Sequence, residues 1–577
     1  MRPSVWAPDC KQVRSVVDGR LVALTPDPDR DGWWQLAEDL PPGTRYGYLL
    51  DSDDQPIPDP RSQSLPDGVH GLTEVYDGDA HRWTDQDWTG RELAGSVIYE
   101  LHAGTFTPGA TLDSAIERLD HLVALGITHV ELLPVNAVNG VWNWGYDGVA
   151  WYAVHQPYGG PDALKRFVQA CHQRGLAVLL DVVYNHLGAS GNYLPRFGPY
   201  LKSGRNTWGD LVNLDGPGSV EVRRYILDNA LMWLRDFHLD GLRLDAVHAL
   251  ADESRPHLLA QLGAEVAGLS EQLGRPLPLI AESDLNDPVM FTPREQGGYG
   301  LDGQWDDDVH HVLHAMLTGE RHGYYADFGE LPSLAKVFGG AFFHDGTYSS
   351  FRGRPHGKPV DTAHTPGWRF VVCLQNHDQV GNRAAGDRLT ETLSAGLLRV
   401  GAVLLLTSPF TPMLFMGEEW GAATRWPFFT SHPEPELATA VSQGRLAEFA
   451  DHGWDSSTML DPQDPAAYHG AVLDWSEPGR PGHAELLELY RELIRLRHTE
   501  ADLADPWLDR VAVDFDEQRR WLRITRGRFS VLANLAGHPQ PVPVAGSAEL
   551  VLATAGASRQ DGELVLDAES AAIVRTG

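Results

Sequence analysis

The feature that most constrains the fold is an alternation of apolar strands and amphipathic helices between about residues 95 and 420. The apolar stretch 97–102 precedes a helical pattern at 112–125, and the continuous apolar run 177–183 follows another helical pattern at 161–174. Continuous apolar runs are typical of parallel strands that are buried on both faces. The repeated unit predicts a (β/α)8 barrel. No glycine-rich phosphate-binding motif opens a helix, which disfavours an open dinucleotide-binding sheet.

Short strands flank this region on both sides. The first 90 residues are rich in Pro, Gly and Asp and contain β-type runs at 13–17, 21–24 and 46–50. A helical pattern at 485–497 precedes further short strands at 511–515, 521–524, 530–535 and 564–566. These patterns predict small antiparallel β domains. We therefore divide the chain into an N-terminal β-sandwich (1–90), a catalytic barrel with insertions (91–504) and a C-terminal β domain (505–577).

The composition limits the class of partner. The chain carries 46 Lys and Arg residues against 79 Asp and Glu residues, a formal net charge of −33. Nucleic acids and anionic membranes require a basic surface, so we expect neither as a partner. Three widely spaced cysteines and an N-terminus without an apolar core indicate a cytoplasmic protein without disulfides, and we expect a monomer. The most apolar run, residues 401–416, falls short of a membrane span and is predicted to be a buried strand followed by a loop.

Four of the predicted strands end in polar residues. These stretches are 181–186 (DVVYNH), 241–248 (GLRLDAVH), 277–284 (LPLIAESD) and 370–378 (FVVCLQNHD). The carboxyl ends of the strands of a parallel barrel open on one mouth, where the active sites of such barrels form. A single carboxylate after an apolar strand is often only a helix cap. Together, the four stretches bring several carboxylates, an arginine and two imidazoles to the same mouth.

Asp245 and Glu282 are the strongest candidates for acid–base chemistry. Arg243 lies two residues before Asp245, on the same face of a strand, where it would keep the carboxylate ionised as a nucleophile requires. A structural ion pair at the strand end is the alternative for this stretch. Glu282 has no adjacent cation in the sequence, so we expect burial to raise its pKa. Glycoside hydrolysis needs such a pair, one carboxyl as the acid and one as the nucleophile or base.

The four stretches resemble, in order and character, the signature regions of the α-amylase superfamily of glycoside hydrolases. The resemblance implies that Asp245 is the nucleophile, Glu282 the general acid/base, and Asp378 the carboxylate that stabilises the transition state. Tyr146, in the segment NWGYD (143–147), is similar to the aromatic platform beneath the sugar at subsite −1. The full set of sugar-binding residues implied in these motifs is Tyr146, His186, Arg243, His248, Asn376, His377 and Gln379.

Further segments narrow the resemblance to the maltooligosyltrehalose trehalohydrolases. They are DGVHG (67–71), AESDLNDP (281–288), QWDDDVHH (304–311), QNHDQVGNR (375–383), FMGEEWG (415–421) and DPQDP (461–465). The resemblance implies cleavage of the α-1,4 bond beside the terminal trehalose of maltooligosyl trehalose, with release of trehalose and without a cofactor. It also implies a partner enzyme, a maltooligosyltrehalose synthase, that makes the substrate. The short N-terminus and Ala467 depart from the family pattern, and neither touches catalysis.

The acidic stretch 304–311 has three interpretations. The resemblance favours substrate binding, in which Asp306, Asp307 and His311 line the subsites that receive trehalose. The same stretch could instead be a polar loop that opens a helix, or it could ligate a metal, which we place last because the chemistry needs none. Asn185 stands where many amylases bind structural calcium, but the following loop offers few carboxylates. We therefore predict no required metal.

Two other functions remain open. A glycogen branching or debranching enzyme of the same superfamily would have the same preceding β domain, and would differ by transfer to a sugar acceptor or by action on α-1,6 bonds. A catalytically silent glycan-binding protein could also use this fold. The presence of Asp245, Glu282 and Asp378 argues against it, because loss of one of these carboxylates would be its signature. For residues 1–90 we favour a packing role over glycan binding.

Overall fold

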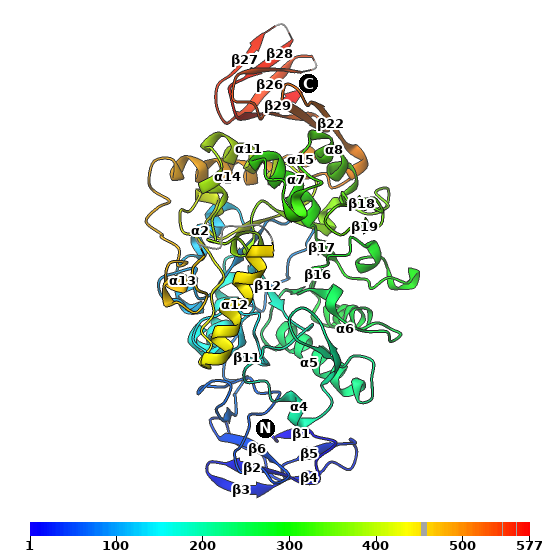
Figure 1. The fold of residues 1–577 in the computed structure, drawn as a ribbon, viewed down its shortest axis with the longest axis vertical. Coiled ribbons are helices and arrows are strands. Elements are labelled where there is room, and N and C mark those ends of the chain that lie inside the picture. Colours follow the sequence, from blue (N-terminus) through cyan, green and yellow to red (C-terminus); the bar gives the residue numbers. More distant parts are fainter. Residues whose placement is uncertain (452–458, 545, 561, 577) are drawn as a thin grey trace.

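A closed barrel of eight parallel strands occupies the middle of an elongated molecule (Figure 1). The computed structural model describes residues 1–451, 459–544, 546–560 and 562–576. The barrel strands follow one another around the barrel in chain order and are β8 (Ile98–Leu101), β9 (His129–Leu132), β12 (Ala177–Val182), β15 (Gly241–Leu244), β16 (Leu279–Ala281), β17 (Gly303–Trp305), β20 (Phe370–Cys373) and β21 (Thr411–Phe415). The predicted (β/α)8 barrel is therefore confirmed.

The inward-facing residues of the barrel form two layers of opposite character. The lower layer is an apolar cluster that includes Ile98, Leu179, Ile280 and Met413. Side chains of a strand alternate between its two faces, so the residues two positions further along also point inward. Those residues include the buried polar side chains of Glu100, Asp181 and, on the neighbouring strands, Glu131 and Arg243. The strand register places Glu100 beside Glu131 and Asp181 beside Arg243, so the barrel interior becomes charged toward its mouth.

Helices cover the outside of the barrel, against outward-facing residues such as Tyr99, Val130 and Leu242. The principal helices are α1 (Leu112–Ile116), α2 (Leu119–Leu125), α3 (Gly160–His172), α5 (Ser219–Asp236), α6 (Leu258–Leu273), α7 (Asp307–Thr318), α8 (Leu331–Gly340), α11 (Ala395–Leu406), α14 (His483–Thr499) and α15 (Ala501–Ala504). The helix predicted at 112–125 is thus two helices. At the break, the Arg118 guanidinium lies 4.5 Å from the centre of the Trp475 ring.

One segment of the barrel differs from the sequence prediction, and a second combines the end of a strand with the start of a helix. Residues 401–416, predicted as a buried strand followed by a loop, contain the second half of α11 and then strand β21. Helix α11 packs against α14 and the C-terminal sheet, and a helix buried on several sides gives the same apolar run as a buried strand. The stretch 304–311 starts inside strand β17, and the chain is helical from Asp307.

Shorter elements connect the barrel units. They are β10 (Asn136–Ala137), β11 (Ala150–Val154), α4 (Leu194–Phe197), β13 (Leu201–Arg205), β14 (Asp210–Val212), β18 (Tyr348–Ser349), β19 (Arg354–Pro355), α9 (His377–Gly381), α10 (Leu389–Thr392), α12 (Pro435–Asp451) and α13 (Pro465–His469). Strands β13 and β14 form an antiparallel hairpin after the third barrel strand. This hairpin lies within the loop that the sequence marked only as poor in carboxylates.

The N-terminal region contains two antiparallel sheets, β1–β5–β4 and β3–β2–β6–β7. Their strands are β1 (Ser4–Trp6), β2 (Val13–Val17), β3 (Arg20–Ala23), β4 (Thr25–Pro26), β5 (Trp33–Gln35), β6 (Arg45–Leu50) and β7 (Thr73–Glu74). Arg61 ties this region to the barrel. Its guanidinium donates to Asp228 Oδ2 on α5 at 2.9 Å and to the Tyr152 hydroxyl at 2.8 Å, and it lies over the Tyr225 ring.

The C-terminal region also consists of two antiparallel sheets, β22–β23–β24–β29–β26 and β25–β28–β27. Their strands are β22 (Val511–Asp516), β23 (Trp521–Arg526), β24 (Phe529–Asn534), β25 (Gln540–Pro543), β26 (Ala548–Ala553), β27 (Ala557–Gln560), β28 (Glu563–Leu566) and β29 (Ser570–Thr576). This region lies at the opposite end of the molecule from the N-terminal sheets (Figure 1). The predicted C-terminal antiparallel β structure is confirmed.

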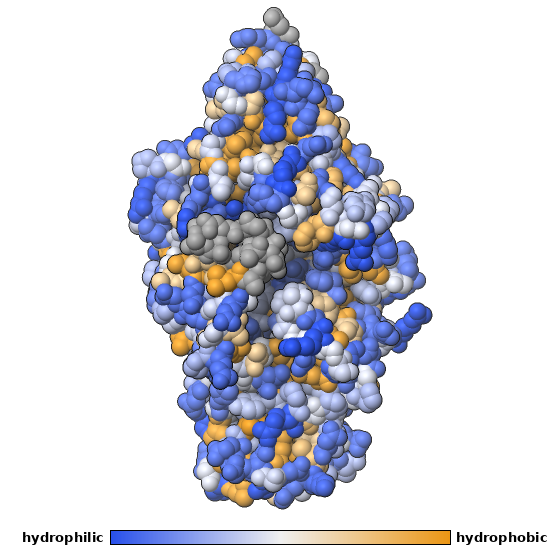
Figure 2. Space-filling model, in the orientation of Figure 1, coloured by the Kyte–Doolittle hydropathy of each residue, from blue (hydrophilic) through white to orange (hydrophobic). Residues whose placement is uncertain are grey.

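Hydrophilic residues cover most of the face shown in Figure 2, and apolar residues form small scattered groups on it. That distribution fits the excess of Asp and Glu in the chain. No helix in the described parts of the chain is both long enough and apolar enough to cross a membrane.

A buried histidine fastens the linker before the barrel to the bottom of the barrel. The Nδ1 atom of His172 lies 2.8 Å from Asp85 Oδ2, and its Nε2 atom lies 2.8 Å from Asp240 Oδ2. Trp88 stacks on the imidazole with ring centres 4.6 Å apart. Burial opposes the charge of His172, but the hydrogen bonds to Asp240 and Asp85 outweigh it and raise its pKa.

We expect His172→Gln to lower the free energy of unfolding by about 2 kcal/mol near pH 6, because it removes the charged donor that two buried carboxylates share. Asp240 keeps its ion pair with Arg275, and Asp85 keeps its contact with His238. A group whose pKa is raised by folding stabilises fully below its unfolded pKa, and that stabilisation is lost as the pH rises through the folded pKa. The difference between wild type and variant should therefore shrink at alkaline pH. Urea unfolding at several pH values tests this, and a difference that grows with pH would contradict it.

Candidate active site

The mouth of the barrel collects the carboxylates that the sequence singled out. Asp245 follows strand β15, and Glu282 follows β16. Asp307 and Asp378 lie in the first turns of α7 and α9, directly after the sixth and seventh strands. All four groups thus stand at the carboxyl ends of adjacent barrel strands, because the parallel topology brings those ends together.

The buried guanidinium of Arg243 connects the carboxylates. Its Nη1 atom donates to Asp245 Oδ1 at 2.8 Å and to Asp181 Oδ2 at 2.7 Å, and its Nη2 atom lies 2.9 Å from Glu282 Oε2. The Trp305 ring lies 4.2 Å from the guanidinium carbon. The expected pairing of Arg243 with Asp245 is confirmed. Glu282 has no cation next to it in the sequence but has Arg243 beside it in the fold, because adjacent parallel strands bring together residues that are far apart in the chain. The expected rise of its pKa through burial stays a prediction.

Burial works against the charge of Arg243, but the negative charges of Asp181, Glu282 and Asp245 outweigh it and raise its pKa far above the ordinary value. The guanidinium is therefore permanently charged. Burial raises the pKa of Asp181 to about 7, although Arg243 acts in the opposite direction. Asp181 also accepts a hydrogen bond of 2.5 Å from the Tyr146 hydroxyl, so this carboxyl fixes both the cation and the predicted sugar platform.

Asn185 holds the other oxygen of Asp245. Its side-chain amide donates to Asp245 Oδ2 at 2.6 Å, and its carbonyl oxygen lies 2.7 Å from His186 Nδ1. The second ring nitrogen of His186 lies 2.9 Å from the backbone oxygen of Tyr146. Asn185 thus orients the candidate nucleophile in this structure. Both nitrogens of His186 have protein partners, which makes this imidazole a support of the site; its predicted contact with sugar stays a prediction.

His377 lies between two carboxylates. Its Nδ1 atom is 2.6 Å from Glu100 Oε1, and its Nε2 atom is 3.4 Å from Asp378 Oδ2. Burial alone would lower the pKa of His377. The negative charges of Asp378 and Glu100 outweigh burial and raise the pKa to about 9. The Tyr146 ring stacks on the imidazole with centres 5.0 Å apart. An imidazolium at this position places a positive charge beside Asp378 and under the mouth.

The acidic side chains that follow strand β17 lie in different environments. Asp306 caps α7, and its Oδ1 atom accepts hydrogen bonds from Asp308 N and Val309 N. Asp308 turns away from the mouth and accepts from Asn286 Nδ2 at 2.7 Å. Capping is therefore the observed role of Asp306. Among the described residues, no group of three or more His, Cys, Asp or Glu side chains is placed to hold a metal ion.

Asp307 faces the other carboxylates of the mouth. Burial, together with the charges of Glu282, Asp378 and Asp284, raises its pKa to about 8. It is therefore protonated at neutral pH and can donate a hydrogen bond. His311 lies one helical turn further along α7 among aromatic rings, with the Tyr324 ring 4.9 Å away. Burial lowers the pKa of His311 to about 3, so its imidazole is neutral.

The three remaining predicted sugar-binding residues lie around the same mouth. His248 accepts a hydrogen bond from Asp284 N at its Nδ1 atom, at 3.2 Å. Asn376 is buried and caps α9 by accepting from Gln379 N at 2.8 Å. The Gln379 side chain accepts from the Tyr325 hydroxyl at 3.3 Å. These contacts place all three residues, and their role in sugar binding stays a prediction.

Sequence reasoning missed four residues that support the site, namely Glu100, Asp181, Asn185 and Trp305. Asp181 and Asn185 lie inside a stretch that was singled out, but Asp181 was given no role and Asn185 was considered only as a calcium position. Glu100 and Trp305 lie within strands that were read as apolar or overlooked. For Glu100 and Asp181 the available signal was a charged residue at an inward position of an otherwise apolar strand.

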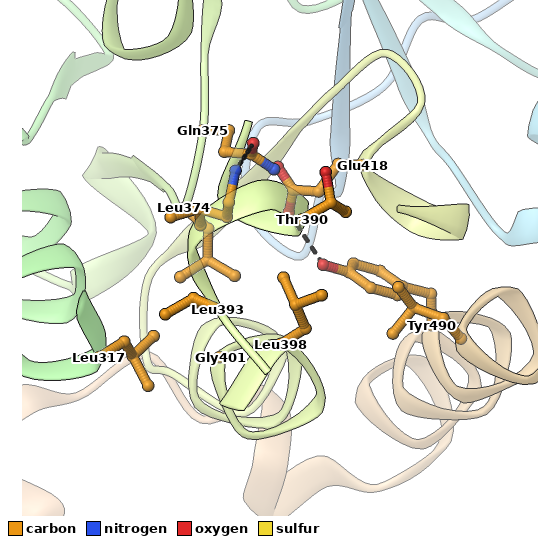
Figure 3. Close-up of a pocket in the computed structure, with 11 residues that line it drawn as sticks. Leu317, Leu374, Gln375, Thr390, Leu393, Leu398, Gly401, Glu418 and Tyr490 are labelled. Atoms are coloured by element: carbon orange, nitrogen blue, oxygen red, sulfur yellow. Dashed lines mark hydrogen bonds between the residues drawn. The ribbon is translucent and has the colours of Figure 1, made fainter. Parts of the chain in front are cut away.

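A separate small cavity lies outside the last two barrel strands (Figure 3). Leucines from several elements line it, and Tyr490 on α14 donates to Glu418 Oε1 at 3.0 Å across it. Burial raises the pKa of Glu418 to about 8, which keeps this carboxyl neutral. With a volume of about 10 Å³ the cavity has room for roughly one water molecule, so it does not serve as a sugar site.

Known proteins share this architecture and sequence. Residues 75–208 match the family "Alpha amylase, catalytic domain", and residues 506–573 match a domain of unknown function (DUF3459). Malto-oligosyltrehalose trehalohydrolase from Rhizobium sp. (strain M-11) is 56% identical, and the match covers 100% of this chain and 97% of that protein. The Arthrobacter ramosus protein of the same name is 57% identical over 99% of each chain.

The chain belongs to the malto-oligosyltrehalose trehalohydrolase family. This family places it among the glycoside hydrolases of the α-amylase superfamily. A crystal structure of a putative α-amylase from Salmonella typhimurium superimposes with a TM-score of 0.90 at 34% identity, covering 100% of this chain and 97% of that chain. The resemblance to the trehalohydrolases that the signature segments indicated is confirmed.

For a trehalohydrolase with this mouth, we expect kcat/KM to fall above about pH 8, where Asp307 loses its proton and adds a negative charge beside Glu282 and Asp378. Asp307→Asn keeps this side chain neutral at every pH. The alkaline limb of the kcat/KM profile of the variant should therefore move up toward about pH 9, where His377 loses its proton. A pH profile of both proteins tests this, and superimposable alkaline limbs would show that another group controls the rate.

Proposed function

We propose that this enzyme hydrolyses the α-1,4-glucosidic bond next to the terminal trehalose of maltooligosyl trehalose and releases trehalose and a maltooligosaccharide. One observation carries the mechanistic part of the proposal: a single buried guanidinium, that of Arg243, contacts both Asp245 and Glu282. The substrate rests on the names of the full-length relatives. These relatives favour a trehalohydrolase over a branching or debranching enzyme.

In the proposed reaction, Asp245 attacks the anomeric carbon of the glucosyl unit at subsite −1 while Glu282 gives its proton to the leaving oxygen of trehalose. The glycosyl–Asp245 ester that forms is then hydrolysed by water, which gives a proton back to Glu282. Arg243 and Asn185 hold the two oxygens of Asp245, so the carboxylate is oriented before substrate binds. Asp378, beside the His377 imidazolium, stabilises the positive charge that develops on the sugar.

The binding surface of the mouth is suited to a neutral sugar. Tyr146 offers a ring face, and Asp307 in its protonated form offers a hydroxyl donor. Carboxyl groups and imidazoles bind sugar hydroxyls by hydrogen bonds, without any need for a cofactor or metal. We further propose that Asp306 and His311 belong to the wall that receives trehalose, since both lie on the segment that carries Asp307.

We also propose that the protein works as a cytoplasmic monomer, downstream of a maltooligosyltrehalose synthase that supplies its substrate. The three cysteines are free thiols, as suits a reducing compartment. Size-exclusion chromatography with light scattering tests the oligomeric state, and a mass near twice 63.5 kDa would contradict the monomer.

Product analysis tests the specificity directly. The enzyme is incubated with maltotriosyl trehalose and, separately, with maltopentaose, and the sugars are resolved by chromatography. We expect trehalose and maltotriose from the first substrate and little reaction of the second. Equal cleavage of both substrates would indicate a general α-amylase-type hydrolase, and longer or branched products would indicate a branching enzyme.

The nucleophile assignment predicts that Asp245→Asn lowers kcat on maltotriosyl trehalose by about 10³-fold or more, because an amide cannot form the ester. Asp113→Asn is a matched control, since Asp113 lies on α1 in an exposed ion pair with Arg166. We expect the control to keep wild-type activity and both variants to unfold at about the wild-type temperature. Normal turnover by Asp245→Asn would mean that the nucleophile is misassigned.

The two-step mechanism predicts that the anomeric configuration is retained. Retaining glycosidases place their two catalytic carboxyl groups about 5–5.5 Å apart, whereas inverting enzymes need room for water between them. The shared contact with Arg243 keeps Asp245 and Glu282 close, which favours retention. Proton NMR during the first minutes of hydrolysis should show the α-anomer of the maltooligosaccharide first. Early appearance of the β-anomer would rule out the covalent step.

A further inference from the structure

The carboxylate of Asp378 receives a hydrogen bond from one side chain. The Nδ2 atom of Asn382 donates to Asp378 Oδ1 at 3.1 Å, and the backbone N of Asn382 donates to the backbone oxygen of Asp378 at 2.9 Å. Among the described residues, no other group donates a hydrogen bond to this carboxylate. The imidazole of His377 is 3.4 Å from the second oxygen. The direction in which the carboxylate points therefore depends on Asn382.

An arginine from a distant part of the chain holds Asn382 in turn. The Nη2 atom of Arg445, on α12, donates to Asn382 Oδ1 at 2.9 Å and to the backbone oxygen of Gly381 at 3.4 Å. Gly381 and Asn382 end the short helix α9, which begins with His377 and Asp378. The last carbonyl oxygens of a helix lack partners within it, and a cation at that end can bind them. Arg445 thus fixes the end of the helix that carries both charged groups.

Aromatic rings connect the same arginine to His377. The guanidinium carbon of Arg445 lies 4.7 Å from the centre of the Phe428 ring. Phe428 packs edge-on against Trp144 with ring centres 5.1 Å apart, and Trp144 packs edge-on against His377 at 5.7 Å. A Cβ atom at Gly381 would overlap the Trp144 ring, so glycine allows α9 to lie this close to the indole. Helix α9 is therefore held at its end by a cation and along its side by aromatic rings.

We propose that Asn382 is a positioning residue, which points the Asp378 carboxylate at the sugar in subsite −1 and is itself kept in place by Arg445. The proposal rests on the function proposed above. A carboxylate stabilises developing positive charge best when it is oriented before the transition state forms. Because the amide of Asn382 is neutral, it orients Asp378 without cancelling the negative charge that the transition state requires.

The alternative is that Asn382 only anchors α12. The two roles use different atoms of the side chain, because Oδ1 accepts from Arg445 and Nδ2 donates to Asp378. Asn382→Asp keeps the acceptor and removes the donor, and Arg445→Met removes the anchor and leaves the donor in place. Asn382→Leu removes both contacts without adding a charge. These three variants therefore separate positioning from anchoring.

The test measures kcat and KM of wild type and the three variants on maltotriosyl trehalose. Arg425→Met is a matched control, since Arg425 is exposed and pairs with Glu391 at 2.7 Å. Circular dichroism and thermal unfolding check that each protein is folded at the assay temperature. If Asn382→Leu does not fold, the comparison of Asn382→Asp with Arg445→Met carries the test.

We expect Asn382→Leu and Asn382→Asp to lower kcat about tenfold or more, with KM within about twofold of wild type, because the unreacted substrate has no charge for Asp378 to stabilise. Arg445→Met should lower kcat only about threefold, because Asn382 keeps its donor but loses its support. The Arg425→Met control should match wild type.

Equal kcat values for Asn382→Leu and Arg445→Met would overturn the proposal, since anchoring alone would then explain the loss. A raised KM with unchanged kcat would also overturn it, because it would indicate binding of the unreacted sugar. A wild-type enzyme that cleaves maltopentaose but releases no trehalose would instead overturn the proposed function. The variants would then be compared on maltopentaose, so the two failures can be told apart.

Discussion

The active site depends on one buried positive charge. The guanidinium of Arg243 lies inside the barrel, where an unpaired charge costs far more than the fold could tolerate. Its pairing with Asp181, Asp245 and Glu282 makes the burial possible, and the same contacts set the positions of the two proposed catalytic carboxyls. The requirement to neutralise a charge and the requirement to orient reacting groups are therefore met by the same bonds.

This arrangement divides the barrel into a part that stabilises and a part that reacts. Below the mouth, inward apolar residues such as Ile98 and Met413 fill the barrel, and outward residues pack on the helices. Nearer the mouth, Glu100, Glu131 and His377 replace apolar side chains. Burial and the charge of Glu100 raise the pKa of Glu131 far above its ordinary value, so this carboxyl stays neutral and limits the negative charge in the layer.

The sequence allowed the barrel, the flanking β structure and the residues of the mouth to be predicted, because strand ends are marked by apolar runs that stop at polar residues. It did not allow the contacts between strands to be predicted. Glu282 has no cation near it in the chain, yet lies beside Arg243 across adjacent strands. Asn185 suggested a calcium position but binds Asp245. The error at residues 401–416 has a different origin, since a buried helix and a buried strand are equally apolar.

The contacts of Arg61 bear on how this enzyme could be rebuilt. Arg61 comes from the N-terminal region, but its guanidinium is bound by Asp228 and Tyr152 and lies over Tyr225. Two of these partners belong to α5, the helix that leads directly into strand β15 and thus to Arg243. The N-terminal sheets are consequently no interchangeable module. A chimera with the N-terminal sheets of another superfamily member would also need, on its barrel, the acidic and aromatic residues that contact the incoming N-terminal region.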